Sequence, residues 1–353
     1  QKKGILPDTV TYICTLKACS IIKNMGQGQE IHAEIVKKGL FESDVVLGNA
    51  LLDMYAKSGF LHDAKRIFEL LLIRDEIAWN VLMEGYVDHG HSKEALTCFK
   101  AMKLDGVLPS PVTFVSVLKA CGDLKDTGKG DEIHADIMRH GLLQTDSFLG
   151  SALIDMHIKQ GLPETAQEVF DKLVVRDTVM WNIIIAGYVE HGQSKDALVC
   201  FEQMQLETIA PDSVTLVLSL KACSSIGANE HGRLIHFEIT KKGLTERGNV
   251  GNAMIDMYAK CGLLMESEKV IQDLQIKDVV SWNALIAGYA QLGESRKVFY
   301  TFNRMLEEGI NPDAVTFISI LKACSHAGLF SEGWMLYENM SKVYGIALTA
   351  EHH

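Results

Sequence analysis

The chain has 353 residues, of which 47% are hydrophobic and 22% are charged, so it has enough apolar side chains for a large core and too few charges for a disordered chain. No apolar run approaches the roughly 20 residues that a membrane-spanning helix needs. With 34 Lys and Arg against 45 Asp and Glu the net charge is −11, so a nucleic acid has to bind at a locally basic face.

Three phrases recur at intervals of about 102 residues, which is the signature of a repeat architecture. The first, PDTVTYICTLKAC in its first copy, starts at Pro7, Pro109, Pro211 and Pro312. The second, GNALLDMYAK in its first copy, starts at Gly48, Gly150 and Gly251. The third has the frame Trp-Asn-x-x-x-x-Gly-Tyr and starts at Trp79, Trp181 and Trp282. Each super-repeat divides at a recurring Asp into three units, of 36, 31 and 35 residues in the first copy.

Each unit has the pattern of two helices. Between residues 76 and 110, one apolar stripe at helical spacing is followed by a break at His89-Gly90 and then by a second stripe. The first stripe is Trp79, Leu82, Met83 and Tyr86, and the second is Ala95, Phe99 and Met102. The recurring prolines precede the next first helix, and no stretch indicates a strand. Because one hairpin cannot bury its stripe alone, we expect a right-handed superhelical α-solenoid of helix-turn-helix repeats.

Several fragments imitate chemical motifs without completing them. The eight cysteines contain no CxxC pair, and the four that close Leu-Lys-Ala-Cys are expected to be small buried side chains: Cys19, Cys121, Cys223 and Cys324. An H-x-E-like pattern at His32, His134 and His236 lacks the P-C-x-x-C of zinc deaminases, so we expect half-buried helix histidines. The runs Gly26-x-Gly28 and Gly122 to Gly130 lack a phosphate loop's spacing, and we expect inter-helix turns. No enzyme activity, metal or cofactor is predicted.

The three unit lengths in strict order resemble the pentatricopeptide repeat family, and specifically its plant PLS subclass, in which P, L and S units of about 35, 36 and 31 residues alternate. Ten units fit: L 9–44, S 45–75, P 76–110, L 111–146, S 147–177, P 178–212, L 213–247, S 248–278, P 279–313 and L 314–349. Residues 1–8 resemble the tail of an earlier P unit, and 350–353 a truncated C-terminal end. We expect a fragment cut at both ends.

The resemblance implies sequence-specific binding of single-stranded RNA, with one base read per repeat by the fifth and last residues of a unit. In S and P units the fifth residues are Asn49, Asn80, Ser151, Asn182, Asn252 and Asn283. The corresponding last residues are Asp75, Ser110, Asp177, Asp212, Asp278 and Asp313. L units carry Ile13, Val115, Val217 and Ile318, which cannot hydrogen-bond a base edge and are expected to be spacers. The implied reading is x-U-C-x-G-U-x-U-U-x, from the RNA 5′ end.

Two further features extend this hypothesis. Apolar residues at the second position are expected to sandwich bases, namely Val46, Ile77, Phe148, Val179 and Val280. Asn249 breaks that series, and Arg247 stands where Asp is expected. Two lysine rows are predicted to contact phosphates: Lys17, Lys119, Lys221 and Lys322 in L units, and Lys57, Lys159 and Lys260 in S units.

Alternatives stay open at this point. Asn, Ser and Asp before an apolar helix are also preferred N-caps, and each lysine can equally be a solvated surface residue. The resemblance implies the target-recognition arm of an organellar C-to-U RNA editing factor, or of another RNA-processing factor, in a mitochondrion or chloroplast. A deaminase domain, absent from this chain, would come from a C-terminal region or in trans, with editing-complex proteins as further partners. The rival hypothesis, favoured by the acidic charge, is a protein-binding scaffold of the tetratricopeptide type.

Overall fold

The computed structural model describes residues 7–41, 44–144, 147–245 and 248–347. Within these ranges it contains twenty α-helices, one short 3-10 helix and no strand, so the predicted all-α fold is confirmed. The chain divides into two compact parts, residues 1–176 and 177–353, and each is described by itself. The superhelical path through both parts stays a prediction. Arg247 and the two chain ends, 1–6 and 348–353, lie outside the described residues.

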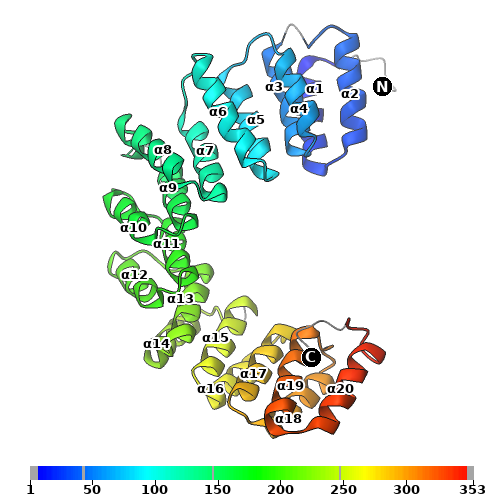
Figure 1. Ribbon diagram of the computed structural model, residues 1–353, viewed down its shortest axis with the longest axis vertical. Coiled ribbons are helices and arrows are strands. Elements are labelled where there is room, and N and C mark those ends of the chain that lie inside the picture. Colours follow the sequence, from blue (N-terminus) through cyan, green and yellow to red (C-terminus); the bar gives the residue numbers. More distant parts are fainter. Residues whose placement is uncertain (1–6, 42–43, 145–146, 246–247, 348–353) are drawn as a thin grey trace. The chain divides into compact units, whose positions relative to one another are not determined.

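The first part consists of five helical hairpins (Figure 1). They are α1 (Thr9–Ile22) with α2 (Met25–Lys37), α3 (Val45–Lys57) with α4 (Leu61–Leu70), α5 (Glu76–Asp88) with α6 (Ser92–Leu104), α7 (Pro111–Leu124) with α8 (Thr127–Arg139), and α9 (Ser147–Lys159) with α10 (Pro163–Lys172). A 3-10 turn, η1 (Leu142–Gln144), precedes α9. Helices α1, α3, α5, α7 and α9 pack successively side by side, and each second helix packs against the first helix of its own hairpin. The first helices therefore form one layer and the second helices another.

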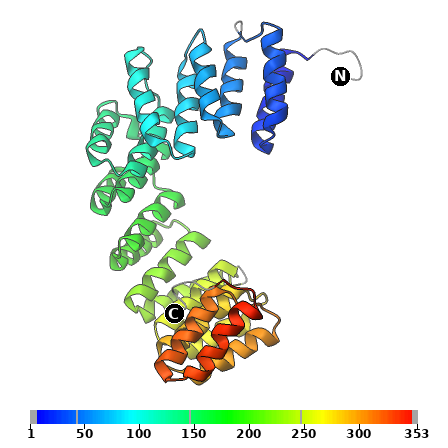
Figure 2. The ribbon, with the colours of Figure 1, turned by 45° about the vertical axis from the view of Figure 1, so that its right-hand side comes forward.

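The second part repeats this arrangement with five more hairpins (Figure 2). They are α11 (Thr178–Glu190) with α12 (Ser194–Leu206), α13 (Ser213–Ile226) with α14 (Asn229–Lys241), α15 (Gly248–Lys260) with α16 (Leu264–Asp273), α17 (Val279–Gln291) with α18 (Ser295–Glu307), and α19 (Ala314–Ala327) with α20 (Phe330–Lys342). Helices α11, α13, α15, α17 and α19 again pack successively. Each of the ten predicted unit ranges contains one hairpin, while the unit boundaries themselves stay predictions.

The recurring residues fill the core between hairpins. Trp79, Trp181 and Trp282 are buried, and the two predicted stripes of the 76–110 unit are buried throughout. The glycine within the tryptophan frame lets adjacent first helices approach closely. A Cβ added at Gly85 would lie 2.7 Å from the Ala56 Cβ, and one added at Gly288 would lie 2.7 Å from the Ala259 Cβ. A larger residue there would overpack the contact of α3 with α5 or of α15 with α17.

The expected glycine-rich turns of the L units are only partly correct. The turn between α7 and α8 falls within the run Gly122 to Gly130, at Lys125 and Asp126, but Gly122 lies inside α7 and Gly130 inside α8. Gly26 and Gly28 likewise lie within α2. The glycines serve helix packing instead, because a Cβ at Gly28 would lie 2.8 Å from the Met54 Sδ on α3. The turn itself is made by Lys125 in the left-handed region, with φ of 51°.

Other expectations about buried groups are confirmed. Cys19, Cys121, Cys223 and Cys324 are buried free thiols, and burial raises the pKa of Cys121 to about 12. The three H-x-E-like histidines are half-buried in second helices.

In the part of the chain that the structure describes, no helix is both long and apolar enough to cross a membrane. No cluster of three or more His, Cys, Asp or Glu side chains in those same ranges is placed to hold a metal ion.

Candidate functional site

The last residue of a predicted unit caps the first helix of the next hairpin. Asp75 Oδ1 accepts a hydrogen bond from the backbone N–H of Ala78 at 2.9 Å, which satisfies an N–H that the helix itself leaves unpaired. The same type of contact is made by Asp8, Asp44, Asp177, Asp212, Asp278 and Asp313, and by Ser110 through its hydroxyl. The capping interpretation of these residues is therefore correct for every one of them.

The same carboxylates also hold fifth-position asparagines. Asn49 Nδ2 donates to both oxygens of Asp75, at 3.1 and 3.2 Å, although the two residues are 26 positions apart. Equivalent bonds join Asn182 to Asp212 at 3.2 and 3.3 Å, Asn252 to Asp278 at 3.1 Å, and Asn283 to Asp313 at 2.9 Å. Capping and asparagine binding are thus not alternatives, because one carboxylate does both.

A third group completes this arrangement, and our reasoning from the sequence missed it. The Asn182 Oδ1 accepts a hydrogen bond from the Thr215 hydroxyl at 2.6 Å, and the Asn283 Oδ1 accepts one from Thr316 at 2.6 Å. In the S unit, the Asn252 Oδ1 accepts from the Ser281 hydroxyl at 2.8 Å. These fully buried hydroxyls stand at the third position of the following unit. The signal was the Val-Thr pair inside each recurring Pro phrase, three residues after a helix cap.

Three predicted site residues depart from this geometry. Asn80 Nδ2 donates to Glu76 at 3.2 Å and not to Ser110, while its Oδ1 accepts from Thr113 at 2.7 Å. The Ser151 hydroxyl donates to the backbone carbonyl of Ser147 at 3.1 Å. Ser151 belongs to the first part of the chain and Asp177 to the second, so each is described separately.

Asn49 is the third departure. Its Oδ1 is buried without a hydrogen-bond partner, because Ala78 stands where the other pairs have a hydroxyl. The helix caps themselves do not differ. Asp75 and Asp278 each accept a hydrogen bond from the backbone N–H of the third residue of the following helix, Ala78 and Ser281 respectively. The S units that contain Asn49 and Asn252 therefore differ by one side-chain oxygen at this point.

Three of the paired aspartates, Asp212, Asp278 and Asp313, have a lowered pKa. Partial burial acts to raise the pKa of the Asp212, Asp278 and Asp313 carboxyls. The backbone N–H, asparagine amide and hydroxyl donors around them outweigh that effect and hold each pKa below its ordinary value. Each site therefore combines a fixed negative charge with an oriented amide.

Apolar side chains at the second position of the units are exposed. The predicted second-position residues are between 53% and 80% exposed, namely Val46, Ile77, Phe148, Val179 and Val280. The L units have the same feature, which the sequence analysis did not include, at Val10, Val112, Val214 and Val315. Asn249, which breaks the series, is exposed as well. The fifth-position residues of the L units, Ile13, Val115, Val217 and Ile318, are half-buried and apolar.

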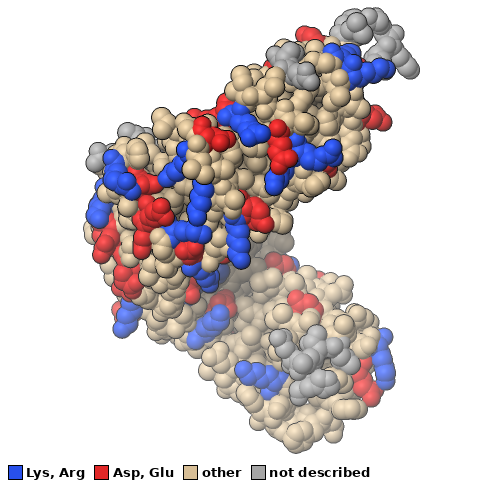
Figure 3. Space-filling view, turned by 45° about the horizontal axis from the view of Figure 1, so that its top comes forward, with Lys and Arg blue, Asp and Glu red and all other residues tan. Residues whose placement is uncertain are grey.

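The predicted lysine rows are exposed but only partly free of carboxylates. Each S-unit lysine pairs with an aspartate one turn earlier: Lys57 with Asp53 at 2.9 Å, Lys159 with Asp155 at 3.0 Å, and Lys260 with Asp256 at 2.9 Å. In the L units Lys119 pairs with Asp88 at 2.7 Å, whereas Lys17, Lys221 and Lys322 have no carboxylate of the described residues within 4.0 Å. Basic and acidic side chains are accordingly interspersed on the face seen in Figure 3.

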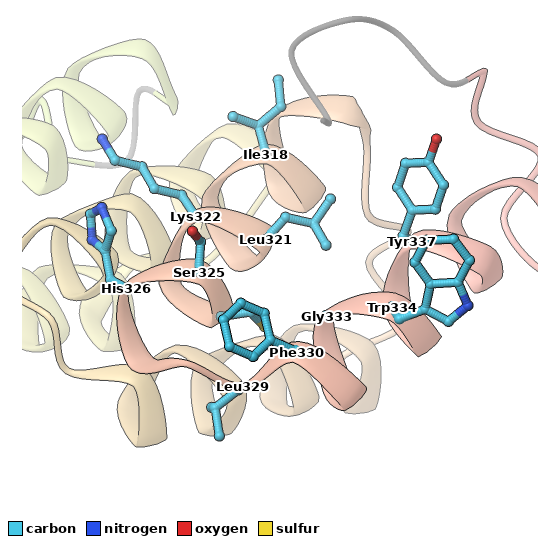
Figure 4. A pocket seen from close by; sticks show the side chains of 11 residues that line it. Ile318, Leu321, Lys322, Ser325, His326, Leu329, Phe330, Gly333, Trp334 and Tyr337 are labelled. Carbon is cyan, nitrogen blue, oxygen red and sulfur yellow. The ribbon is translucent and has the colours of Figure 1, made fainter.

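A groove of about 680 Å³ lies between α19 and α20 (Figure 4). It is lined by apolar and aromatic side chains that include Leu321, Phe330 and Trp334. Leu321 is only half-buried, although its equivalents in the other L units are fully buried: Leu16, Leu118 and Leu220. Those three lie on helices against which α3, α9 and α15 pack. The groove thus has the character of a helix-stacking surface.

Stacked helical hairpins, four of whose first helices carry a fixed asparagine-aspartate pair, define an α-solenoid repeat protein. The model of the PPR repeat family matches residues 74–123, 176–225 and 277–326, and the model of the PPR repeat matches 49–75, 151–177, 252–279 and 315–343. Together they cover more than half of the sequence. The chain belongs to the pentatricopeptide repeat family.

Known proteins resemble the chain over nearly its whole length. The pentatricopeptide repeat-containing proteins At5g27110 and At1g11290, chloroplastic, of Arabidopsis thaliana are each 35% identical over all of this chain, which covers 51% and 43% of them. The chain thus spans about half the length of the curated relatives it matches. Among solved structures, the pentatricopeptide repeat protein PPR10 in complex with an 18-nt psaJ RNA element matches with a TM-score of 0.66 and 16% identity, over 98% of this chain and 57% of that one. PPR10 from maize matches with a TM-score of 0.54 and 18% identity, over 99% and 61%. These two likenesses establish the helical-repeat fold.

Proposed function

We propose that the chain binds single-stranded RNA with one base per repeat, read by the fifth and last residues of its S and P units. The observation that carries the proposal is the bonding of asparagine to the capping aspartate at four equivalent repeat positions. In helix α1 the fifth position is Ile13, and Asp44 caps α3 without such a partner. The family membership and the RNA bound to the PPR10 neighbour support the same function.

The geometry suits a pyrimidine edge. An asparagine amide has two N–H donors and two acceptor lone pairs. In the pair of Asn252 with Asp278, one donor goes to the carboxylate and one lone pair accepts from Ser281. One donor and one lone pair remain, and uracil offers carbonyl oxygens and an N3–H to match them. In the proposed reading, x-U-C-x-G-U-x-U-U-x, the shorter side chain of Ser151 leaves room for a purine.

The exposed second-position side chains complete the proposed base site. A base lying against a fifth-position amide is flanked by the side chains of successive first helices, such as Val46 and Ile77 on α3 and α5. Such contacts tolerate any base, because every base has an apolar face, and they contribute less per base than the about 1–3 kcal/mol measured for aromatic stacking. They therefore add affinity, while the amides add selectivity.

The finer role follows the family pattern. We propose a PLS-type array that acts as the target-recognition arm of an organellar RNA-processing factor, with C-to-U editing carried out by a deaminase domain elsewhere in the whole protein or in trans. Several of the similar Arabidopsis proteins have chloroplastic in their names, which supports an organelle. Editing-complex proteins would then be further partners. Within this proposal the array recognises RNA and catalyses no step itself.

A protein-binding scaffold is the second candidate. The net charge of −11 and the four neutralised lysines favour it, because a nucleic acid needs a basic surface. This candidate predicts no preference among bases.

Filter binding to a randomised single-stranded RNA pool distinguishes the two candidates. We expect enrichment of pyrimidines and of one G at the proposed spacing, with weak binding of duplex RNA, whose base edges are hidden. Equal binding of single- and double-stranded RNA, or no binding at low salt, would contradict RNA reading.

A further inference from the structure

We infer that the third-position hydroxyl of the following unit is a specificity-determining residue, because it fixes which way the asparagine amide faces. The residues are Thr113, Thr215, Ser281 and Thr316. The inference rests on the proposed RNA-reading function and adds a positioning residue that contacts the asparagine and not the base.

The hydroxyl has one proton, and its surroundings decide where that proton goes. Thr215 Oγ1 accepts a hydrogen bond from the backbone N–H of Asp212 at 3.2 Å. It lies 2.6 Å from the Asn182 Oδ1 and 3.0 Å from the Asp212 Oδ1. The shorter contact directs the proton to the amide oxygen. Thr316 has the same distances to Asn283 and Asp313, 2.6 and 3.0 Å.

The amide is therefore held at both ends. The ionised Asp212 accepts only, so it selects the Nδ2 side of Asn182, and the Thr215 proton selects the Oδ1 side. Rotating the amide by 180° would face its N–H₂ toward a hydroxyl proton and its oxygen toward a carboxylate. A fixed orientation matters for reading, because uracil and cytosine present reversed donor and acceptor patterns at N3 and the neighbouring exocyclic position.

The chain contains a pair of S-unit asparagines that differ in this hydroxyl and in the second-position residue, Val46 in one unit and Asn249 in the other, so variants at the hydroxyl position alone isolate its effect. Asn49 and Asn252 occupy the same place in their S units, and each donates to the capping aspartate at 3.1 Å. Ser281 donates to Asn252, whereas Ala78 leaves the buried Oδ1 of Asn49 without a partner. At Asn49 only the carboxylate opposes reversal of the amide. We therefore expect weaker discrimination between U and C at the second nucleotide than at the eighth.

Reciprocal variants of the whole chain test this. Binding of Ala78→Ser, Ser281→Ala and the wild type is measured with ten-nucleotide RNAs that carry U or C at nucleotide two or eight. Ala78→Ser should raise the preference for U over C at nucleotide two by about three- to tenfold, the worth of one hydrogen bond, and Ser281→Ala should lower it at nucleotide eight by the same factor. Each variant should leave the preference for U over C at the other nucleotide unchanged. Ser281→Thr, which keeps a hydroxyl, should behave as the wild type.

The outcomes separate this inference from the proposed function. If the hydroxyl is purely structural, its removal should change the stability in urea and the affinity for all RNAs together. The ratio of the affinities for the U and C RNAs would then not change. That result overturns the inference while RNA reading stands. A wild-type chain that binds the RNAs without any preference between U and C at either nucleotide overturns both.

Discussion

Helices α1 and α3 begin in the same way but differ in what their fifth residues contact. Asp8 caps α1 and Asp44 caps α3, so each helix has the N-terminal partner that its backbone requires. Asp75, which follows α3, caps α5 and also holds Asn49, whereas Asp44, which follows α1, makes only the cap, because α1 carries Ile13. A cap alone is thus enough to start a helix of this array. The asparagine pairing is an addition that the start of a helix does not demand.

Removing the two aspartates should separate these roles, with the largest expected effect. Asp44→Ala should lower the free energy of unfolding by about 1 kcal/mol, the usual worth of a cap. Asp75→Ala should cost about 2–3 kcal/mol, because the buried Asn49 amide also loses its acceptor. Urea denaturation measures both. Only Asp75→Ala should reduce base preference, at the second nucleotide, and equal losses from both variants would show that the pairing adds nothing.

Changing a fifth residue should transfer specificity. Ser151→Asn, which places in the second S unit the residue found in the first and third, should shift preference at the fifth nucleotide from G toward U by about 1–3 kcal/mol. The matched control Val115→Ala, in the preceding L unit, should leave the fourth nucleotide unselective. RNAs substituted at each nucleotide in turn measure this. If Ser151→Asn changed stability alone, the reading role of that position would be refuted.

The contact between L and S helices also differs between copies, and this predicts a pH effect. His32 on α2 faces Tyr55 on α3 at 2.9 Å, but His134 on α8 faces His157 on α9 at 3.2 Å. Burial, and then the neighbouring His134, lower the pKa of His157 to about 4. Because an unfolded histidine has a pKa near 6.5, the unfolded chain takes up the proton first, and stability is lost as the pH falls below that value.

We expect the free energy of unfolding to fall by roughly 1 kcal/mol between pH 7 and 5.5, allowing for screening by solvent. His157→Tyr, the residue found at Tyr55 and Tyr258, should remove the His157 share of this dependence and leave that of His32, His134 and His236, whose pKa burial also lowers. Urea titrations at both pH values test this. If the free energy of unfolding of the variant depended on pH as much as that of the wild type, the assignment to His157 would be contradicted.

Lysines give the smallest predicted effect. Three L-unit lysines have no carboxylate of the described residues within 4.0 Å, so log affinity for single-stranded RNA should fall with log salt at a slope of about −2, at about −0.7 per phosphate contact. Lys221→Ala should reduce the slope by about 0.7, whereas Lys57→Ala, whose lysine is paired with Asp53, should reduce it less. Equal changes from both variants would contradict this difference between the L and S rows.

The fold was largely predictable because its signals are local. The stripe of Trp79, Leu82, Met83 and Tyr86 marks a helix within eight residues, and it recurs. The L-unit turns were not predictable in this way. Gly28 resembles a turn residue, yet its purpose is set by Met54 of the next hairpin, which a local pattern does not include.

The candidate site was predictable as a set of positions but not as a structure. Repeat spacing picks out Asn49 and Asp75, but their bond depends on how neighbouring hairpins stack. The Val-Thr pair of the recurring phrase contains Thr215, but the bond of its hydroxyl to Asn182 joins residues 33 positions apart and depends on how the hairpins stack. The ion pairs of the lysine rows were not predictable either, because they also depend on stacking. Lys119, for example, pairs with Asp88, 31 residues earlier on α5.

The most direct test of the account is the base preference of the whole chain at every nucleotide of x-U-C-x-G-U-x-U-U-x. Thirty single substitutions, three at each of the ten nucleotides, are compared with the parent RNA by equilibrium binding. The account predicts losses of about 1–3 kcal/mol at nucleotides two, three, five, six, eight and nine, and almost none at one, four, seven and ten, which face the L units. Uniform losses along the RNA, or losses at the L-unit nucleotides, would contradict it.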